Sequence, residues 1–258
     1  MTEAVLQVSG VSKRFGGLQA LQDVGLTIEA GQIYGLIGPN GAGKTTFFNV
    51  ITGMYTPDQG EFSLQGQAYQ PSAVHEVARA GIARTFQNIR LFGEMSALQN
   101  VMVGRHVRTH SGVLGAIFRT RRFTDQEQAM AEHARALLAE VGLADRAEDK
   151  ARTLSYGDQR RLEIARALAT EPVLLALDEP AAGMNPTEKM QLRELIDRIR
   201  TERCTVLLIE HDVKLVMGLC DQVTVLDHGQ VICQGIPAHV QSDPKVIEAY
   251  LGSGASHG

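Results

Sequence analysis

The sequence predicts an α/β protein with a core built on a parallel sheet, an antiparallel β part near the N-terminus and an inserted α-helical lobe. Two runs in the second half of the chain, Val173–Asp178 and Thr205–Glu210, are almost wholly apolar, as strands are when helices cover both faces of a parallel sheet. Short strand-like segments separated by turn residues occupy residues 5–66. Across residues 88–170 the strand-like runs disappear and helical patterns dominate, which predicts the inserted lobe.

Four segments near the start of the chain are short and apolar, and turn sequences such as TPDQG interrupt them. Turn residues between short apolar runs favour strands joined by tight connections. The expected strands are Val5–Gly10, Val24–Glu29, Gln32–Gly38 and Glu61–Gly66.

A helix is predicted between the two apolar strands. Asn185 fits the N-cap and Pro186 the first helical position, where a backbone N–H has no helical partner to lose. Apolar residues then recur at helical spacing, at Met190, Leu192, Leu195, Ile196 and Ile199. The order strand, helix, strand predicts a crossover between neighbouring parallel strands.

The predicted lobe contains a second amphipathic helix. Thr124 and Glu127 match a capping box at its start. Its apolar face consists of Met130, Ala134, Leu137, Leu138 and Val141. The basic segment 105–123 lacks the regular aromatic interleaving of a base-stacking surface, which favours a solvated loop over a binding patch.

These patterns set the expected domain limits. One domain spans residues 1–252, in which residues 1–87 and 171–252 form the α/β core and residues 88–170 the helical lobe. The small polar residues 253–258 are expected to form a flexible tail.

Composition narrows the classes of protein. The chain has 258 residues and a formal net charge of −4, so electrostatics gives no reason to expect nucleic acid as the main partner. Cys204, Cys220 and Cys233 show no CxxC spacing, and we expect reduced, buried thiols. The N-terminus has no apolar signal core, and no apolar run approaches the roughly 18 residues of a spanning helix. Any membrane role is therefore expected to depend on partners.

The stretch GPNGAGKT matches the spacing G-x-x-x-x-G-K-[ST] of a phosphate-binding P-loop. It follows a predicted strand and precedes a predicted helix, so backbone N–H groups and the positive end of the helix both face the anion. Lys44 is expected to reach the β and γ phosphates, and Thr45 to offer its hydroxyl to Mg²⁺. The expected nucleotide-binding residues are Gly38, Pro39, Asn40, Gly41, Ala42, Gly43, Lys44, Thr45 and Thr46.

Acidic residues and a histidine follow the two apolar strands. Asp178 ends the first strand and is expected to hold Mg²⁺ through its water shell, and Glu179 to orient or deprotonate an attacking water. His211 follows the second strand, where neutral imidazole would hydrogen-bond to the γ phosphate or to Glu179. Lys44, Glu179 and His211 are therefore the catalytic candidates.

The stretch LSYGDQRR offers a second place to hold phosphate. Ser155 supplies a hydroxyl and Gly157 permits a close backbone approach, at the start of a predicted helix. The alternative is a plain helix start, because Ser155-x-x-Asp158 also fits a capping box that needs no ligand.

Taken with GPNGAGKT, the stretch LSYGDQRRLEIARALATEPVLLALDEPAAGMNP resembles the nucleotide-binding subunits of ABC transporters. The resemblance implies that two such domains face each other head to tail, so that Ser155, Tyr156, Gly157 and Asp158 meet the neighbour's ATP. Beside the other motifs, this reading is preferred to the plain helix start.

Further residues acquire roles only through this resemblance. It implies that Phe15 stacks on adenine, and that Gln87 touches Mg²⁺ and relays the nucleotide state to the helical lobe. Asn185 stands at the dimer interface, where aspartate is usual in the family. ATP and Mg²⁺ are the implied cofactors.

The signature stretch departs from the pattern of ABC domains at large. Tyr156 replaces a glycine, and Asp158 stands where glutamine is usual. An extra anion near a triphosphate weakens dimer closure unless it is neutralised, and Arg160 or Arg161 is the expected neutralising residue.

Within the family, the chain is most similar to the ATP-binding subunits of branched-chain amino-acid importers, the Liv-type systems, on stretches such as GIARTFQNIRLFGEMSALQNV and PKVIEAYLG. The resemblance implies a peripheral protein on the cytoplasmic face of the inner membrane. Its implied partners are two permease subunits, a second ATPase subunit of the same or a related kind and, through the permease, an extracytoplasmic solute-binding protein. The alternatives are a transporter for another cargo (urea, another amino acid or lipopolysaccharide), a soluble non-transport ABC ATPase, and a small-molecule kinase.

Overall fold

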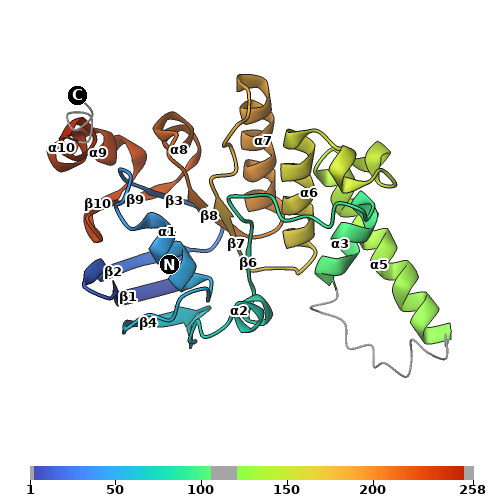
Figure 1. The fold of residues 1–258 in the computed structure, drawn as a ribbon, viewed down its shortest axis with the longest axis horizontal. Coiled ribbons are helices and arrows are strands. Elements are labelled where there is room, and N and C mark those ends of the chain that lie inside the picture. The colour runs from blue at the N-terminus through green and yellow to red at the C-terminus, as the bar shows by residue number, and fades with distance from the viewer. Residues whose placement is uncertain (1–2, 106–120, 253–258) are drawn as a thin grey trace. The chain divides into compact units, whose positions relative to one another are not determined.

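The computed structural model describes residues 3–105 and 121–252 (Figure 1). The predicted tail 253–258 and most of the basic segment 105–123 lie outside the described residues. The chain divides into two compact units. Among the described residues, the first unit takes 3–84, 173–182 and 193–252, and the second takes 85–105, 121–172 and 183–192. The predicted core and lobe limits, after residues 87 and 170, remain a prediction.

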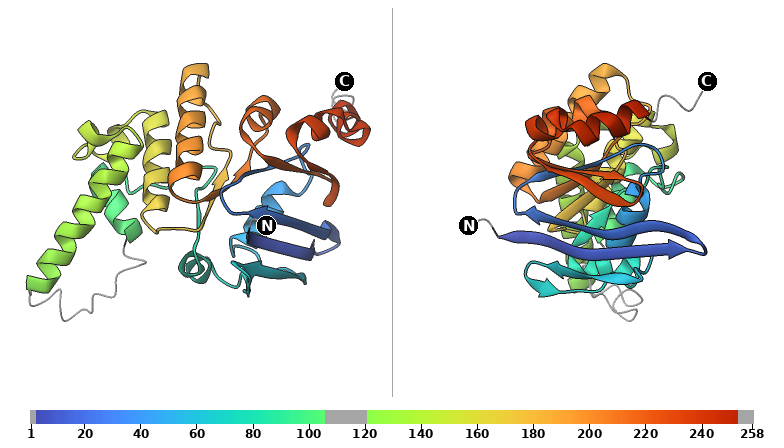
Figure 2. Two further views of the ribbon diagram at one scale, coloured as in Figure 1. Left: turned by 180° about the vertical axis from the view of Figure 1, so that it is seen from behind. Right: turned by 90° about the vertical axis from the view of Figure 1, so that its left-hand side faces the viewer.

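The first unit contains a four-stranded antiparallel sheet in the order β2-β1-β4-β5. The long strands β1 and β2 are the blue arrows of Figure 2. The strand bounds are β1 Ala4–Phe15, β2 Leu18–Glu29, β4 Gln59–Leu64 and β5 Gln67–Ala68. The expected antiparallel β part is therefore confirmed.

A six-stranded sheet in the order β10-β9-β3-β8-β7-β6 forms the other layer of the first unit. Its strands pair in parallel from β9 to β6, and β10 is an antiparallel edge. The bounds are β3 Ile33–Ile37, β6 Ile82–Arg84, β7 Leu174–Asp178, β8 Thr205–Ile209, β9 Gln222–Asp227 and β10 Gln230–Gly235. Every residue of β3, β7 and β8 is buried, as their apolar sequences require.

The helix α1, Lys44–Ile51, is anchored in the core between the two sheets. Phe47 and Phe48 are fully buried, in one apolar cluster with residues of β1, β3, β7 and β8. Burying a phenylalanine contributes about 1.5–3 kcal/mol, so the start of α1 is held at a fixed place against the end of β3. The other helices of this unit are α2 Val74–Ala80, α8 Val213–Leu219, α9 Pro237–Ser242 and α10 Pro244–Gly252.

The helix α7, Pro186–Glu202, begins in the second unit and ends in the first. Asn185 and Glu188 form a reciprocal cap at its start: the Glu188 N–H donates to Asn185 Oδ1 at 3.0 Å, and the Asn185 N–H to Glu188 Oε2 at 2.9 Å. The predicted cap and the crossover from β7 through α7 to its neighbour β8 are confirmed. The apolar face is confirmed at Leu192, Leu195, Ile196 and Ile199, which are buried, but not at Met190, which is 57% exposed.

The second unit is helical, with α3 Ala97–Arg105, α5 Arg121–Glu140 and α6 Tyr156–Leu168. The predicted apolar face of α5 is confirmed, since all five residues are buried. Its predicted start is wrong: α5 begins at Arg121, so Thr124 lies inside the helix and is not its N-cap. A capping box is a local pattern, and residues N-terminal to it can continue the helix.

Strands β5, β6, β9 and β10 were not expected from the sequence. The strands β5 and β6 have two and three residues, too few to show periodicity. The three cysteines are buried and form no disulfide, as expected.

Close packing of α3 on α6 generates the first prediction. A Cβ on Gly104 of α3 would collide with the carbonyl oxygen of Arg166 and lie 3.2 Å from the Ala169 Cβ. Because overpacking costs about 1–3 kcal/mol, Gly104→Ala is expected to lower the free energy of unfolding by that amount in denaturant titrations. The control Gly17→Ala, with nothing within 4 Å of the added Cβ, should change it by only a few tenths. Equal effects of the two substitutions would contradict this packing.

Candidate nucleotide site

The loop between β3 and α1 places a buried ammonium group at the head of α1. Lys44 is the first residue of the helix and only 8% exposed, and its Nζ donates to the carbonyl oxygens of Gly38 at 2.7 Å and Pro39 at 2.9 Å. Burial lowers the pKa of Lys44, and the negative charge of Glu179 opposes that shift. A further anion beside Lys44 would compensate this desolvation, so the loop suits phosphate.

Two positions of this loop require glycine. A Cβ on Gly38 would collide with the carbonyl oxygen of Leu226 in β9. Gly43 has φ +99°, in the left-handed region, and a Cβ there would lie 2.9 Å from the carbonyl oxygen of Ala20 in β2. The loop therefore packs backbone to backbone against β9 and β2, and a chain with so few side chains lets backbone N–H groups approach an anion closely.

A cavity of about 410 Å³ lies over this loop, within the first unit. Its lining includes Phe15 at the end of β1, Glu179 after β7, and His228 in the turn between β9 and β10. Phe15 is 42% exposed, and its ring meets Tyr55 edge to face at 5.2 Å. Two larger cavities, of about 580 and 570 Å³, contain none of the expected site residues. The chemistry therefore identifies the smaller cavity as the candidate site.

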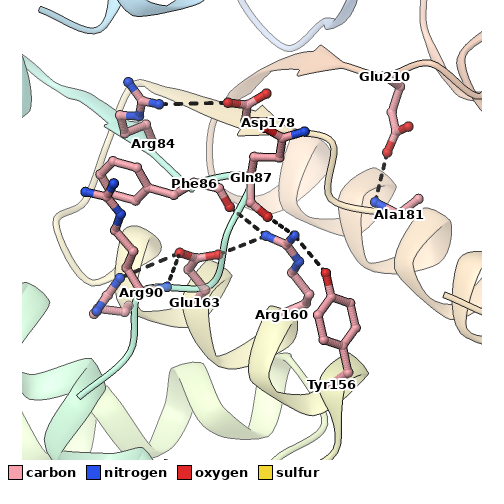
Figure 3. Close-up of polar contacts among 11 residues, drawn as sticks. Arg84, Phe86, Gln87, Arg90, Tyr156, Arg160, Glu163, Asp178, Ala181 and Glu210 are labelled. Atoms are coloured by element: carbon pink, nitrogen blue, oxygen red, sulfur yellow. Dashed lines mark hydrogen bonds and ion pairs between the residues drawn. The ribbon is translucent and has the colours of Figure 1, made fainter. Parts of the chain in front are cut away.

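The expected metal ligand Asp178 is buried at the end of β7. Arg84 Nη2 of β6 lies 3.9 Å from Asp178 Oδ2 (Figure 3). Arg84 Nη1 also donates to Asn49 Oδ1 of α1 at 3.0 Å and to Thr52 Oγ1 at 2.7 Å. Sequence reasoning did not identify Arg84, although it stands in the stretch IARTFQN. Its contacts connect α1 with the acidic end of β7.

The backbone of Glu179 is held in a conformation that non-glycine residues seldom adopt. Its φ is +47°, which costs on the order of 1 kcal/mol, and its N–H donates to the Ile209 carbonyl at 2.9 Å. His211 is exposed, with Nδ1 3.7 Å from Glu179 Oε2. The structure thus brings together Lys44, Glu179 and His211, the three catalytic candidates.

Glu210 fixes the turn that follows Glu179. Its side chain is fully buried, and its Oε1 accepts a hydrogen bond from the Ala181 N–H at 2.8 Å (Figure 3). Burial raises the pKa of Glu210, while the Ala181 hydrogen bond and the nearby His211 oppose the shift. The signal in the sequence was an acidic residue ending the otherwise apolar run TVLLIE.

The signature residues stand at the start of α6 in the second unit. Ser155 is the N-cap, and its Oγ accepts the Asp158 N–H at 3.2 Å. Gly157 is buried, and a Cβ on it would lie 3.0 Å from Glu188 Oε1. Arg161 forms an ion pair with Asp158, so of the two expected neutralising residues it is Arg161 that acts. The plain capping interaction is therefore present, and the ligand role of Ser155 stays a prediction.

The other expected residues divide between the two units. Thr45 is exposed on the first turn of α1, in the first unit with Asp178. Gln87 and Asn185 lie in the second unit, where the Gln87 carbonyl accepts a hydrogen bond from Arg160 and Asn185 caps α7.

Among the described residues, one group of His, Cys, Asp and Glu side chains has the geometry to hold a metal ion: Cys233, His239 and Asp243, with ligand atoms within 4.8 Å of one another. Asp243 accepts the Lys245 N–H at 2.8 Å and so caps α10, which accounts for its position. This group contains none of the expected metal ligands.

The fold and the site define a class of protein. A glycine loop between a buried strand and a helix, a buried lysine at the head of that helix and acidic residues at the end of another parallel strand of the same sheet are the features of a P-loop nucleotide-binding protein. A comparison with protein families then matches residues 21–182 to the family described as ABC transporter, and residues 230–256 to one described as branched-chain amino acid ATP-binding cassette transporter.

Curated relatives agree with this match. The chain is 47% identical to the high-affinity branched-chain amino acid transport ATP-binding protein BraF of Pseudomonas aeruginosa, over 98% of this chain and 99% of that protein. It is 44% identical, with the same coverage, to the corresponding protein LivG of Escherichia coli.

Solved structures agree as well. The ADP conformation of an ATP-binding cassette of an ABC transporter superposes with a TM-score of 0.85 and 32% identity, covering 97% of this chain and all of that one. A nucleotide-free cassette of an ABC transporter gives 0.83 at 32% identity, covering 96% of this chain and 98% of the other. The chain therefore belongs to the ABC transporter family and is one of its ATP-hydrolysing cassettes. Among residues 3–105 and 121–252, none of the helices combines the length and the hydropathy that membrane crossing requires.

The buried carboxyl group of Glu210 leads to a prediction about pH. A raised pKa means that folded Glu210 holds its proton to higher pH than it does in the unfolded chain. Its contribution to stability is thus fully present below the ordinary glutamate pKa and is lost as pH rises through the raised folded value. Glu210→Gln keeps an acceptor for Ala181 and removes the titration.

We therefore expect Glu210→Gln to lose less unfolding free energy than the wild type between pH 5 and pH 8, as measured by denaturant titration. The other buried glutamate with a raised pKa, Glu163, is present in both proteins and cancels in the comparison. Identical pH profiles for the two proteins would contradict the assignment.

Proposed function

We propose that the chain is the ATP-hydrolysing subunit of an ABC importer that powers uptake of branched-chain or related amino acids. The observation that carries the proposal is the pairing of a complete P-loop site with near full-length similarity to BraF and LivG, whose names state branched-chain amino acid transport. A relative at lower identity, 34%, is a lipopolysaccharide export ATP-binding protein of Acidithiobacillus ferridurans. The difference in identity favours amino acids as the cargo.

The first unit would hold ATP. Phe15 offers an exposed ring for the adenine, and residues 38–46 offer backbone N–H groups and the Lys44 ammonium for the phosphates. The buried carboxylate of Asp178 and the hydroxyl of Thr45 are hard oxygen donors of the kind that Mg²⁺ prefers, so these residues of the first unit fit that ion. Bound there, Mg²⁺ would neutralise phosphate charge. By the family resemblance, Gln87 of the second unit would respond to the bound nucleotide.

Glu179 would orient and deprotonate the attacking water. Three features hold Glu179 beside the phosphate loop: its strained backbone, the hydrogen bond to Ile209 and the Glu210 contact to Ala181. Because they are present before ATP reacts, no free energy is spent on positioning Glu179 during the reaction. His211, 3.7 Å from Glu179, would hydrogen-bond to the γ phosphate or to Glu179. Lys44 would stabilise charge that develops on the phosphate oxygens.

The second unit would contact the ATP bound by the opposing cassette. Ser155 and Gly157 stand at the start of a 13-residue helix, whose positive end attracts anions. Arg161 neutralises the additional Asp158 carboxylate, which removes the charge repulsion expected from that departure. Asn185 is exposed and would contact the opposing cassette.

The assembly follows from these roles. A second ABC ATPase subunit, two permease subunits and, through them, an extracytoplasmic solute-binding protein would complete the importer. Because the cassette would dock on the permease, it would lie at the cytoplasmic face of the inner membrane.

The experiment that tests this proposal uses Glu179→Gln and Lys44→Ala in the complex purified with its permease subunits. Glu179→Gln is expected to abolish ATP turnover and keep ATP affinity, since it removes the base and leaves the phosphate loop intact. Lys44→Ala should lose ATP affinity. The matched control Glu202→Gln, an exposed carboxyl at the end of α7, should behave as the wild type.

Near-normal turnover in Glu179→Gln would remove Glu179 from its role. The cargo is tested by adding single amino acids with the binding protein: leucine, isoleucine or valine should stimulate ATPase activity. Stimulation by lipopolysaccharide alone would favour the alternative cargo.

A further inference from the structure

Arg160 of α6 is a buried cation whose hydrogen bonds reach well beyond its own helix. Its side chain is 2% exposed. The Nη1 atom donates a hydrogen bond to the Phe86 carbonyl at 2.6 Å. The Nη2 atom donates to the Gln87 carbonyl and, at 2.9 Å, to the Tyr156 hydroxyl (Figure 3). All of these residues belong to the second unit. One guanidinium therefore joins the segment before α3 to the first turn of α6.

The same segment has a second attachment to α6. Glu163 is buried; its Oε2 lies 3.4 Å from Arg160 Nη1, and its Oε1 accepts the Arg90 N–H at 3.3 Å (Figure 3). Burial raises the pKa of Glu163, and the hydrogen bond from Arg90 and the charge of Arg160 oppose the shift. Removing charges from water is expensive, and an apolar pair of equal volume would often serve stability as well or better. Stability alone therefore does not account for a buried Arg160–Glu163 pair at this place.

Tyr156 connects Arg160 to a third segment. Its ring lies 5.4 Å from the Arg160 guanidinium, and a Cβ on Gly183 would lie 3.4 Å from the same ring. The adjacent Gly157 packs on the Glu188 carboxylate, which in turn caps α7. The signature residues 155–158 are thus in contact with residues 183–188 on one side and with Arg160 on the other.

We propose that Arg160, acting through the Tyr156 hydroxyl, is a positioning residue that makes the Phe86–Gln87 backbone, the signature residues and residues 183–188 move as one block. The inference rests on the proposed function, in which Gln87 responds to nucleotide and Ser155 meets the neighbour's triphosphate. A displacement of the Gln87 carbonyl would then shift the first turn of α6 directly, because both are bonded to one rigid guanidinium.

A merely structural role for Arg160 predicts a different outcome, and Tyr156→Phe separates the two. Tyr156 is 46% exposed, so losing its hydroxyl should change the unfolding free energy little, and the ring that packs on Gly183 remains. The kcat of cargo-stimulated ATP hydrolysis by the assembled transporter should fall about three- to tenfold.

The matched control is Tyr34→Phe. The Tyr34 hydroxyl is buried and lies 2.8 Å from Thr224 Oγ1 in the first unit. The substitution therefore removes a buried, hydrogen-bonded tyrosine hydroxyl and leaves the block of the second unit unchanged. It should lower stability more than Tyr156→Phe and leave kcat near the wild-type value.

A double-mutant cycle completes the test. Arg160→Lys keeps the charge but replaces the planar fork of two Nη atoms with a single nitrogen, which cannot reach the acceptors of both. Its effect on kcat should therefore be non-additive with Tyr156→Phe: the double variant should resemble Arg160→Lys alone. Wild-type kcat in Tyr156→Phe, or additive effects, would overturn the inference and leave the proposed function standing. Failure of the wild-type complex to bind and hydrolyse ATP would overturn both.

Discussion

The burial of the Lys44 ammonium is the constraint on which the rest of the site depends. A cation removed from water needs compensating charge, and the nearest partners of Lys44 are the carbonyls of Gly38 and Pro39 and the more distant charge of Glu179. The loop can wrap so tightly only because it carries glycine where β9 and β2 approach. The packing of Phe47 and Phe48 then holds the whole arrangement against the sheet.

Around this loop, groups that are costly to bury or to strain hold the reactive side chains in place. Arg84 connects α1 with Asp178, Glu210 fixes the turn after Glu179, and Glu179 itself adopts a left-handed backbone. Each of these features costs free energy, and the burial of the apolar strands β3, β7 and β8 offsets that cost. In the second unit, Arg160 has the corresponding role, since its hydrogen bonds hold the signature residues in position.

Much of the fold could be predicted from the sequence because its signals were local. The apolar runs of β7 and β8, the cap at Asn185 and the P-loop spacing each follow from a few adjacent residues. The missing strands β5 and β6 were too short for periodicity, and the start of α5 was misplaced because a capping box can also occur inside a helix. Met190 continued the helical spacing of α7 but faces water, because periodicity does not show where a partner surface ends. Arg84 and Glu210 were missed for another reason: their partners are distant in sequence, and no spacing rule indicates which charged residues are buried. For the same reason Arg160 was expected beside Asp158, but it is buried and bonds to the Phe86 and Gln87 carbonyls.

In the proposed assembly, two molecules hold one triphosphate, with the phosphate loop of one and the serine-tipped helix α6 of the other on either side. The most direct test is an experimental structure of the assembled transporter with ATP, arrested by Glu179→Gln. We expect Ser155 Oγ and the Gly157 N–H to lie within hydrogen-bonding distance of the γ phosphate held by the opposing subunit's loop. A closed, ATP-loaded assembly in which these two groups face away from that phosphate would contradict this arrangement.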